Sequence, residues 1–428
     1  MPSVILPNLM FEEELSGQSV GSGTATRRVA ELAPLCGFLR KSPDDVVVTG
    51  PDGVPTDLPV GLDRARYHSI SELTGGEFIG MELRPWGWSE PAVAFAKKHQ
   101  LLCNGPPVSS VRTVNSRRFL ADFDLYGPES DKVAAEQIDL VTSDRQKVSD
   151  QPTLKQQQHR LWFSAICESL TDVRNALENV NFRKLSGGNW VIKSEYSQAA
   201  RNRICGMGPL RERDEHWLRS RFDGGYIVAV EPWVKRISEC GLQYSIHTDR
   251  QTITFDGAVE LYTTFRGQYL GSGISPDAAE HWKGSIEHGF TLAAAAARVG
   301  YFGCLGIDTM RFEDCDGNRF VRFSHDLNAR ITMGRLACGI AAHPEYPESG
   351  IWCHFPAEML SGEDFSFSQK LPGSVRISRT SPRMVGGRPV GVSSGFISSS
   401  DWWDLRDAIK IMTAEIQAGA GQRDREVM

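Results

Sequence analysis

The most constraining feature of the sequence is the segment 303–334, in which two apolar runs flank an Asp-Gly turn. The first run contains GCLGIDTM, the turn is DCDGN at residues 314–318, and the second run is RFVRFSHDLNARITMG. Asp-Gly between two such runs predicts an antiparallel β-hairpin. Because successive side chains of a strand point to opposite faces, Asp326 and Asn328 share one face of the return strand.

If the two strands pair across this turn, Asp308 lies opposite Asp326 and Asn328. Three oxygen-bearing side chains would then converge, with no nearby lysine to neutralise them. Carboxylate and amide oxygens are the ligands that Mg²⁺ prefers. The hairpin therefore predicts a metal site of Asp308, Asp326 and Asn328, for Mg²⁺ carried on a nucleotide's phosphates, with Mn²⁺ as an alternative. Arg330 continues on this face and could hold an anionic reacting group.

Size and composition describe an ordinary globular chain of 428 residues, 40% hydrophobic and 23% charged, long enough for about two or three sub-domains. A formal charge of -6 argues against nucleic acid or an anionic membrane as the main partner. The N-terminus lacks the basic and apolar regions of a signal peptide. Nine cysteines, without a CxxC pair, predict reduced thiols in a cytoplasmic protein.

The order of elements predicts two kinds of sheet. Residues 1–110 alternate strands such as DDVVVT and GEFIGMEL with helices such as ATRRVAELAPLCGFL and PAVAFAKKH, which predicts a small, mostly parallel sheet. Residues 127–158 form a polar insertion, and 161–180 read as a helix. The following runs predict an antiparallel sheet interrupted by one helix, with Ser275 as N-cap and Gly300 as its stop. A final amphipathic helix begins near Asp401.

Three further residues precede the hairpin in an informative order. Lys193 ends the strand WVIK and faces a polar loop, where a lysine can hold phosphates as a point charge. Glu231 ends the strand IVAVE at a proline, where exposed backbone groups could read an adenine edge. Glu239 could accept hydrogen bonds from ribose hydroxyls. Each of these residues, taken alone, is also compatible with a solvated strand end or turn, and the hairpin alone with a surface hairpin.

Taken in order, these residues resemble the ATP-grasp superfamily over roughly residues 1 to 340. The resemblance implies an α/β (α+β) ATP-grasp fold with a Rossmann-like pre-ATP-grasp domain at 1–110. It implies a grasp domain at 111–345, with a lid subdomain at about 185–235. Residues 346–428 would be a C-terminal extension packing on the grasp domain.

The resemblance also implies site roles, residue by residue. Lys193 matches the lysine at the base of the phosphate loop, and Arg330 an arginine that several carboxylate ligases carry beyond the metal-binding asparagine. The other matches are Trp233 and Val234 with Glu231 for adenine, Glu239 for ribose, and Asp308, Asp326 and Asn328 for the metal.

Three departures from the family pattern concern this site. The bridging metal ligand is usually glutamate, and here it is Asp326. Ala199, Ala200 and Arg201 stand where the phosphate loop usually has glycines, so Arg201 or Arg203 would replace backbone donors with charge. A second phosphate lysine is absent, and Arg117 is its best replacement.

The activity implied by the resemblance is that of an ATP- and Mg²⁺-dependent carboxylate–amine ligase acting through an acyl phosphate. An ATP-grasp phosphotransferase and a non-enzymatic nucleotide-binding protein are the alternatives. The partners would be a small-molecule carboxylate and amine, whose identities the sequence leaves open. A homodimer is common among such enzymes. Arginines beyond residue 375 are either a site for an acidic substrate or a solvated surface; they are Arg376, Arg379, Arg383 and Arg388.

Overall fold

The computed structural model describes residues 1–17, 24–50, 53–73, 76–126, 164–196, 202–264, 267–361, 364–365 and 368–426. The chain divides into two compact units. Unit 1 consists of Met1–Asn104, Val259–Ala278 and Ile331–Met428, and unit 2 of Gly105–Ala258 and Ala279–Arg330. The three-segment division expected from the sequence stays a prediction. The expected insertion at 127–158 lies outside the described residues.

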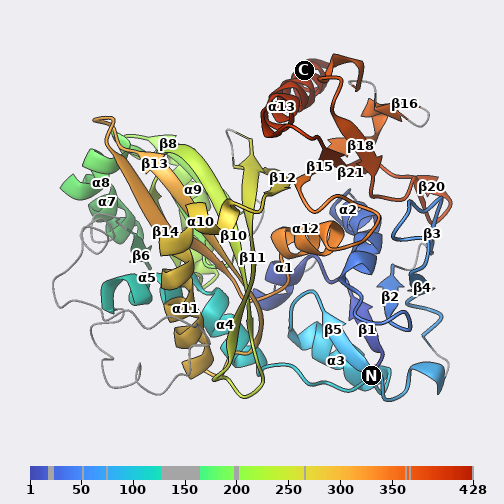
Figure 1. The fold of residues 1–428 in the computed structure, drawn as a ribbon. Coiled ribbons are helices and arrows are strands. Elements are labelled where there is room, and N and C mark those ends of the chain that lie inside the picture. The colour runs from blue at the N-terminus through green and yellow to red at the C-terminus, as the bar shows by residue number, and fades with distance from the viewer. Residues whose placement is uncertain are drawn as a thin grey trace, which may run out of the picture. The chain divides into compact units, whose positions relative to one another are not determined.

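Unit 1 contains a small parallel sheet, as the alternating strands and helices predict. Its strands are β1 (Ser3–Leu6), β2 (Val46–Thr49), β4 (Arg66–Ser69) and β5 (Glu82–Pro85), in the order β4-β2-β1-β5 (Figure 1). All its pairings are parallel. Every residue of β2 is buried, as expected for a parallel strand covered on both faces. The predicted strand GEFIGMEL is only partly correct, because it begins with a short 3-10 helix, η2 (Gly76–Phe78).

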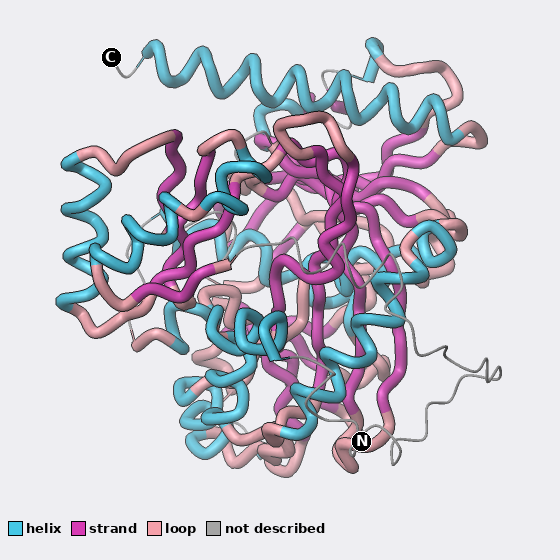
Figure 2. The backbone as a smooth tube through the Cα atoms, turned by 90° about the vertical axis from the view of Figure 1, so that its left-hand side faces the viewer, coloured by secondary structure: helices cyan, strands magenta, loops and turns pink. Residues whose placement is uncertain are grey.

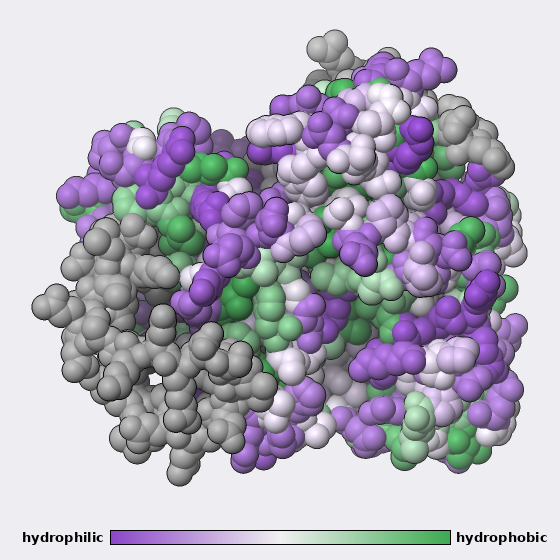
Figure 3. Space-filling model, viewed as in Figure 1, coloured by the Kyte–Doolittle hydropathy of each residue, from purple (hydrophilic) through white to green (hydrophobic). Residues whose placement is uncertain are grey.

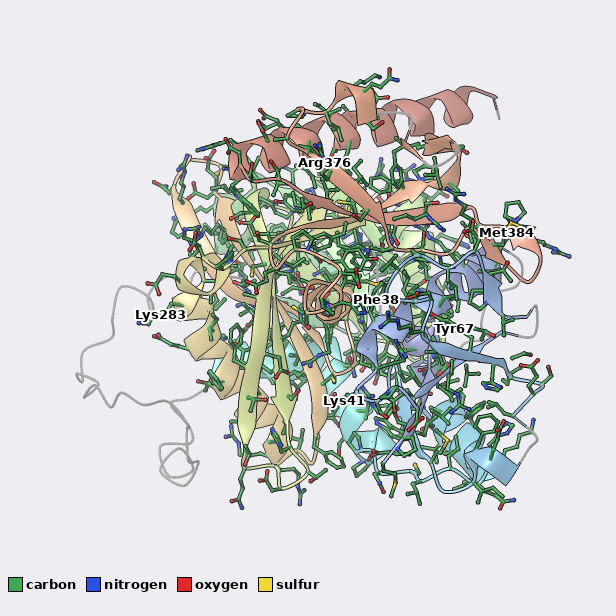
Figure 4. All side chains as sticks on the ribbon, turned by 45° about the vertical axis from the view of Figure 1, so that its right-hand side comes forward. Phe38, Lys41, Tyr67, Lys283, Arg376 and Met384 are labelled. Carbon is green, nitrogen blue, oxygen red and sulfur yellow. The ribbon has the colours of Figure 1, made fainter. Side chains whose placement is uncertain are left out.

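Helical segments connect these strands. They are α1 (Phe11–Leu15), α2 (Thr24–Leu32), the 3-10 helix η1 (Ala33–Leu39) and α3 (Glu90–Lys98). The predicted helix through ATRRVAELAPLCGFL changes to 3-10 geometry at Pro34, which lacks the N–H that an α-helix needs. Tyr67 on β4 donates its hydroxyl to the Pro34 carbonyl at 3.0 Å. Tyr67 and Phe38 of η1 are both labelled in Figure 4. At α3, Ser89 is the N-cap and accepts from the Ala92 N–H.

Unit 1 also contains strands of an eight-stranded sheet, which are antiparallel to one another there and covered on both faces. These strands are the later part of β11 (Ile253–Thr263), β12 (Tyr269–Ile274), β15 (Gly350–Pro356), β21 (Val392–Ser398) and β18 (Arg376–Arg379). Ile351 and Cys353 pack toward the long C-terminal helix α13 (Trp402–Glu426), seen at the top of Figure 2. Trp352, between them, packs toward α12 (Met333–Ala341), as strand alternation requires.

Short elements complete unit 1. They are β3 (Pro55–Thr56), β16 (Leu360–Ser361), β17 (Asp364–Phe365), β19 (Met384–Val385), β20 (Arg388–Pro389), η4 (Ala357–Met359) and η5 (Ser368–Lys370). Two of the C-terminal arginines bind Asp57 beside β3: Arg379 donates to its carbonyl and carboxylate at 2.9 and 3.1 Å, and Arg383 lies 3.5 Å from the carboxylate. Arg376, labelled in Figure 4, donates to the Gly373 carbonyl.

Unit 2 is built on strands of the eight-stranded sheet that follow one another in the order β14-β13-β10-β11. These strands are β10 (Lys235–Ile246), the first part of β11, β13 (Gly303–Glu313) and β14 (Arg319–Asn328). Helix α11 (Lys283–Arg298) lies along one face of this sheet (Figure 1). Ser285 of α11 hydrogen-bonds Thr309 of β13 at 2.9 Å, and Tyr244 of β10 donates to the Ile286 carbonyl at 2.9 Å.

The single helix predicted between Ser275 and Gly300 is wrong at its start and right at its end. A short helix, α10 (Ala278–His281), precedes a break at Trp282, which is the N-cap of α11. At the other end, Gly300 has a φ of 89°. The N–H of Gly300 bonds to the Ala297 carbonyl and the next N–H to the Ala296 carbonyl, which closes the helix in a Schellman motif.

A smaller antiparallel sheet in unit 2 carries its own helices. Its strands are β6 (Ala165–Cys167), β9 (Val228–Pro232), β7 (Asn189–Ser194) and β8 (Arg203–Met207), in that order. Its helices are α7 (Leu170–Glu178), α8 (Val180–Ser186) and α9 (Glu212–Asp223). Trp190 and Phe182 are central to their shared core. The helix predicted over 161–180 is partly wrong, because Ala165–Cys167 pairs with β9 as a strand.

Two helices, α4 (Val108–Asn115) and α5 (Arg117–Tyr126), precede the smaller sheet in the chain. All nine cysteines lie within the described residues and are free thiols. In the part of the chain that the structure describes, no helix combines the length and the apolar character needed to span a membrane. The face shown in Figure 3 is a mixture of polar and apolar patches.

Candidate functional site

The hairpin brings its predicted acidic residues together. β13 and β14 pair antiparallel, with Asp308 directly opposite Asp326 and Gly306 opposite Asn328. Because paired residues share a face and positions two apart do too, all three side chains project from one face of the sheet. The turn between the strands is tied by Asp314, whose carboxylate accepts the N–H groups of Asp316 and Asn318.

Asp326 is held by a buried arginine. Two guanidinium nitrogens of Arg117, at the start of α5, donate to the two oxygens of Asp326 at 2.5 and 3.2 Å. Only 8% of the Arg117 side chain is exposed. The expectation that no nearby lysine would neutralise this cluster is wrong, because the positive charge of Lys193 acts on Asp326, in addition to the direct contact of Arg117.

The pKa values of Asp308 and Asp326 are shifted in opposite directions. Burial, followed by the charges of Asp326 and Glu239, raises the pKa of Asp308 to about 7, against the opposing effect of Arg330. Burial would also raise the pKa of Asp326, but Arg117 and Lys193 outweigh it and lower that pKa well below its usual range. The pair therefore keeps Asp326 ionised and makes Asp308 the carboxylate that a nearby cation would stabilise most.

The smaller sheet contributes a second charged pair. Lys193 on β7 donates to the Glu231 carboxylate on β9 at 2.8 Å, and both residues are buried. Val191 is paired with Glu231 and Lys193 with Ala229, so the lysine and glutamate are diagonal neighbours on one face. Burial would raise the pKa of Glu231, but the charges of Lys193 and Arg117 lower it, so the glutamate is ionised.

Trp233 and Val234 form the connection between the two sheets of unit 2. β9 ends at Pro232 and β10 begins at Lys235, so these two residues alone join them. The Trp233 N–H donates to the Asn189 carbonyl at 3.0 Å. Val234 is buried against Met310 and its neighbours in the hairpin. The strand break predicted near Glu231 lies at this connection.

Glu239 faces the acidic cluster and not a separate subsite. It lies opposite Met310 on β13, two positions from the pair formed by Gly241 and Asp308. Arg236 donates one nitrogen to both Glu239 oxygens at 3.1 and 3.0 Å. His325 lies 3.6 Å from the same carboxylate. The predicted ribose contact of Glu239 stays a prediction, and a nucleotide would have to share this carboxylate with Arg236.

Arg330 and Asn328 also contact each other. The Arg330 guanidinium donates to the Asn328 side-chain oxygen at 2.9 Å, and its positive charge opposes the raised pKa of Asp308. The predicted phosphate-loop residue Arg201 lies outside the described residues. Among the residues that the structure describes, no three His, Cys, Asp or Glu side chains group as metal ligands. The candidate metal site is thus two carboxylates and one amide.

The sequence did not indicate the roles of Arg236 and His325. A register shift between Arg236 and Ser238 in β10 lets Arg236 reach Glu239, three positions away, although regular alternation would separate their faces. A second shift, between Asp308 and Met310, lies beside His325. Burial lowers the pKa of His325 to about 4, so its ring is neutral. Bulges leave no clear signal in a single sequence.

Comparisons with known proteins identify the fold. No protein-family model matches the sequence, and no curated protein matches it. Among solved structures, N5-carboxyaminoimidazole synthetase from Staphylococcus aureus, complexed with ADP, matches with a TM-score of 0.50 and 11% identity. The match covers 90% of this chain and 95% of that chain.

Two further structures give similar scores. An N5-carboxyaminoimidazole ribonucleotide synthetase, also an ADP complex, matches with a TM-score of 0.50 and 10% identity, over 90% of this chain and 94% of that one. A pyruvate carboxylase from Rhizobium etli matches with a TM-score of 0.52 and 11% identity, over 96% of this chain and 37% of that one. At such low identity these matches bear on the fold alone. They confirm the prediction made from the sequence: the chain has the ATP-grasp fold.

Proposed function

We propose that this protein is an ATP- and Mg²⁺-dependent ligase that joins a small-molecule carboxylate to an amine through an acyl phosphate. The observation that carries the proposal is one cluster of charges within unit 2. The charge of Lys193, which pairs with Glu231 on the smaller sheet, acts on Asp326 of the hairpin, and the charge of Arg117 acts on Glu231, Asp308 and Asp326. The synthetases that share the fold include two structures with ADP, which supports a nucleotide as one substrate.

The donor set of the hairpin fits a hard cation. Two carboxylates and an amide oxygen suit Mg²⁺, with Mn²⁺ as the alternative, and such a cation would favour the ionised form of Asp308. Asp308, Asp326 and Asn328 would hold the metal. When bound, the metal would neutralise charge on the transferred phosphoryl group. Asp326 would then bind the metal in one of two ways: it keeps its contact with Arg117, or it gives up that contact.

The proposed reaction has two steps. A carboxylate oxygen of the acid attacks the γ-phosphorus of ATP, and the bond to the β,γ-bridging oxygen breaks, which gives an acyl phosphate and ADP. The amine then attacks the acyl carbon, phosphate leaves, and the amine loses a proton as the amide forms. Lys193 and Arg117 would hold the phosphates, with Arg201 as a further phosphate-binding residue. Arg330 would stabilise the oxyanion that develops on the acyl group.

The nucleotide base would lie at the connection between the two sheets. Its adenine edge would be read by the backbone around Glu231, Trp233 and Val234, and its ribose by Glu239. The free thiols of the cysteines support a cytoplasmic location. The acid and the amine are small molecules, and a homodimer is a compatible assembly.

A product assay tests this proposal. Purified protein with Mg²⁺ and ATP is incubated with panels of acids and amines, separately and together, and ADP and phosphate are measured. We expect both products only when an acid and an amine are present. With an acid labelled in its carboxylate by ¹⁸O, one labelled oxygen should appear in the released phosphate. A phosphorylated product that is stable without an amine would instead establish a phosphotransferase. Nucleotide binding without turnover would leave a nucleotide-binding protein.

A further inference from the structure

The smaller sheet carries a second positively charged side chain, that of Arg203, on the same face as Lys193. On its β7–β8 pair, Lys193 lies directly opposite Arg203, so both side chains leave the same face. The neighbouring pair, Ile192 and Ile204, faces the other way, toward the core with Trp190. Arg203 therefore shares a face with the lysine that is proposed to hold phosphate.

The orientation of Arg203 is fixed by an aromatic ring. Its guanidinium lies over the Trp233 indole, 5.1 Å from the ring centroid, and that of Arg236 lies 5.0 Å from the same centroid. Cations over an indole face are attracted to it by the charge distribution of the ring. Trp233 is itself anchored through its N–H to Asn189, and Arg236 through Glu239. Two guanidiniums are thus positioned on one rigid aromatic residue.

The charges around Arg203 favour an anion there. Burial lowers the pKa of Arg203, and the positive charges of Arg236 and Arg117 lower it further, while Cys205 and Asp326 raise it. Two further guanidiniums, those of Arg236 and Arg117, therefore act on Arg203 and disfavour its charged form. An anion bound beside it would relieve that repulsion. A guanidinium presents paired N–H donors, the geometry that matches phosphate oxygens.

We infer that Arg203 is a polyphosphate-binding residue of the nucleotide site, held in place by Trp233 and Arg236. This inference rests on the proposed function, because it takes the nucleotide to be the ligand of unit 2. The ligand class is a nucleoside di- or triphosphate, with Arg203 contacting the phosphates and not the base. Trp233 would then contribute in two ways, through its backbone at the base and through its ring at Arg203.

Isothermal titration with Mg²⁺ and four probes, ATP, ADP, AMP and adenosine, tests this assignment. The variant Arg203→Met keeps a long apolar stem over Trp233 and removes the charge. We expect it to weaken ATP binding by about ten- to a hundredfold, and adenosine binding by less than about twofold. Arg203→Lys keeps the charge but loses the planar fork, so it should give an intermediate loss for ATP.

A matched control comes from the same unit. Arg221 lies over the Trp217 ring at 5.2 Å, on α9, and Arg221→Met removes a similar stack. It should leave ATP affinity unchanged, and circular dichroism melts of all variants check that they fold. Unchanged ATP affinity in Arg203→Met, or an equal loss for adenosine and ATP, would overturn the inference. A wild-type protein that binds none of the four probes would instead overturn the proposed function on which it rests.

Discussion

At the scale of single residues, the Arg117–Asp326 pair predicts how a substitution of Asp326 changes the free energy of unfolding. Asp326→Asn leaves the Arg117 guanidinium, only 8% exposed, without the carboxylate that accepts from two of its nitrogens. Removing one member of an enclosed ion pair costs more than the pair contributes, because the other charge stays desolvated. We expect Asp326→Asn to lower the free energy of unfolding by about 2 kcal/mol in urea titrations and to abolish ATP turnover.

The adjacent residue provides the control for this prediction. Arg118 pairs with Glu168 at 2.5 Å, but these side chains are 45% and 65% exposed. Exposed pairs contribute little, so Arg118→Ala should change the free energy of unfolding by less than about 1 kcal/mol. Equal effects of the two substitutions on stability, or full ATP turnover by Asp326→Asn, would contradict the role assigned to Arg117 and Asp326.

What the sequence could predict at this scale was the register of Asp308 and Asp326. An Asp-Gly turn and strand alternation together determine which residues face each other, and both are local. The partners of those residues were not predictable. Arg117 is more than two hundred positions from Asp326, and only the tertiary fold brings α5 onto the hairpin. The same holds for Arg236, whose side chain reaches Glu239 through a bulge.

At the scale of elements, Asp45 ties the first two strands of unit 1 together. Its carboxylate, 1% exposed, accepts the Ser3 N–H at 2.8 Å, the Ser3 hydroxyl at 2.9 Å and the Lys41 N–H at 2.8 Å. Burial would raise the pKa of Asp45, but these hydrogen bonds lower it. A lowered folded-state pKa stabilises the protein above the unfolded value of about 3.9, and this contribution is lost as the pH falls through the folded value.

The pH dependence of unfolding measures this contribution. We expect Asp45→Asn to be about 1–3 kcal/mol less stable than the wild type at pH 7, with the difference shrinking as the pH is lowered below about 4. Asp44→Asn, at the exposed neighbouring position, should show no such trend. A stability difference between Asp45→Asn and wild type that stays constant from pH 7 to pH 3 would show that Asp45 does not act through its charge.

The close contact of α11 with the sheet predicts that replacing its Gly289 by alanine destabilises the protein. A Cβ at Gly289 would lie 2.1 Å from the hydroxyl of Tyr244, a fully buried residue that is fixed by its bond to the Ile286 carbonyl. Alanine favours a helix over glycine by about 1 kcal/mol, but overpacking costs about 1–3 kcal/mol. We therefore expect Gly289→Ala to lower the melting temperature.

Gly373→Ala is the control for this prediction, because a Cβ at Gly373 would meet no atom within 4 Å. Its melting temperature should match that of the wild type. A higher melting temperature for Gly289→Ala would mean that helix propensity outweighs the close approach of α11 to β10.

Element boundaries show where sequence reasoning works and where it fails. Gly300 was predictable as a helix stop because a left-handed residue is a local requirement that glycine meets. The break at Trp282 was not, because the side chain is only 4% exposed and its burial depends on tertiary packing. Ala165–Cys167 is similar: its pairing with β9 joins residues far apart in sequence, and its local pattern resembles the helix that follows.

At the scale of the whole molecule, unit 1 depends on both ends of the chain. Leu35, Phe38 and Leu62 share a hydrophobic cluster with Trp352 and Phe396. A fragment of residues 1–104 would expose this cluster, so we expect it to lack a cooperative thermal transition by near-ultraviolet circular dichroism. Mixing it with a fragment of residues 331–428 should restore some protection of its amides from hydrogen exchange. A cooperative transition in the 1–104 fragment alone would contradict the claim that unit 1 needs both ends of the chain to fold.

The fold class was predictable because alternating strands and helices, followed by antiparallel runs, narrow the architecture to few solutions. Unit 1 is assembled from three separate stretches of the chain, and their grouping depends on tertiary packing that leaves no local sequence pattern.

The central claim is that unit 2 binds a magnesium–nucleotide complex at the cluster of Lys193, Asp308 and Asp326. Isothermal titration of MgATP into the full chain tests it most directly, beside Lys193→Ala and Asp308→Asn variants whose folding is checked by circular dichroism. We predict one MgATP per chain for the wild type and at least about tenfold weaker binding for Lys193→Ala, since a charge-assisted hydrogen bond is lost. No binding by the wild type, or the same affinity in both variants as in the wild type, would contradict the claim.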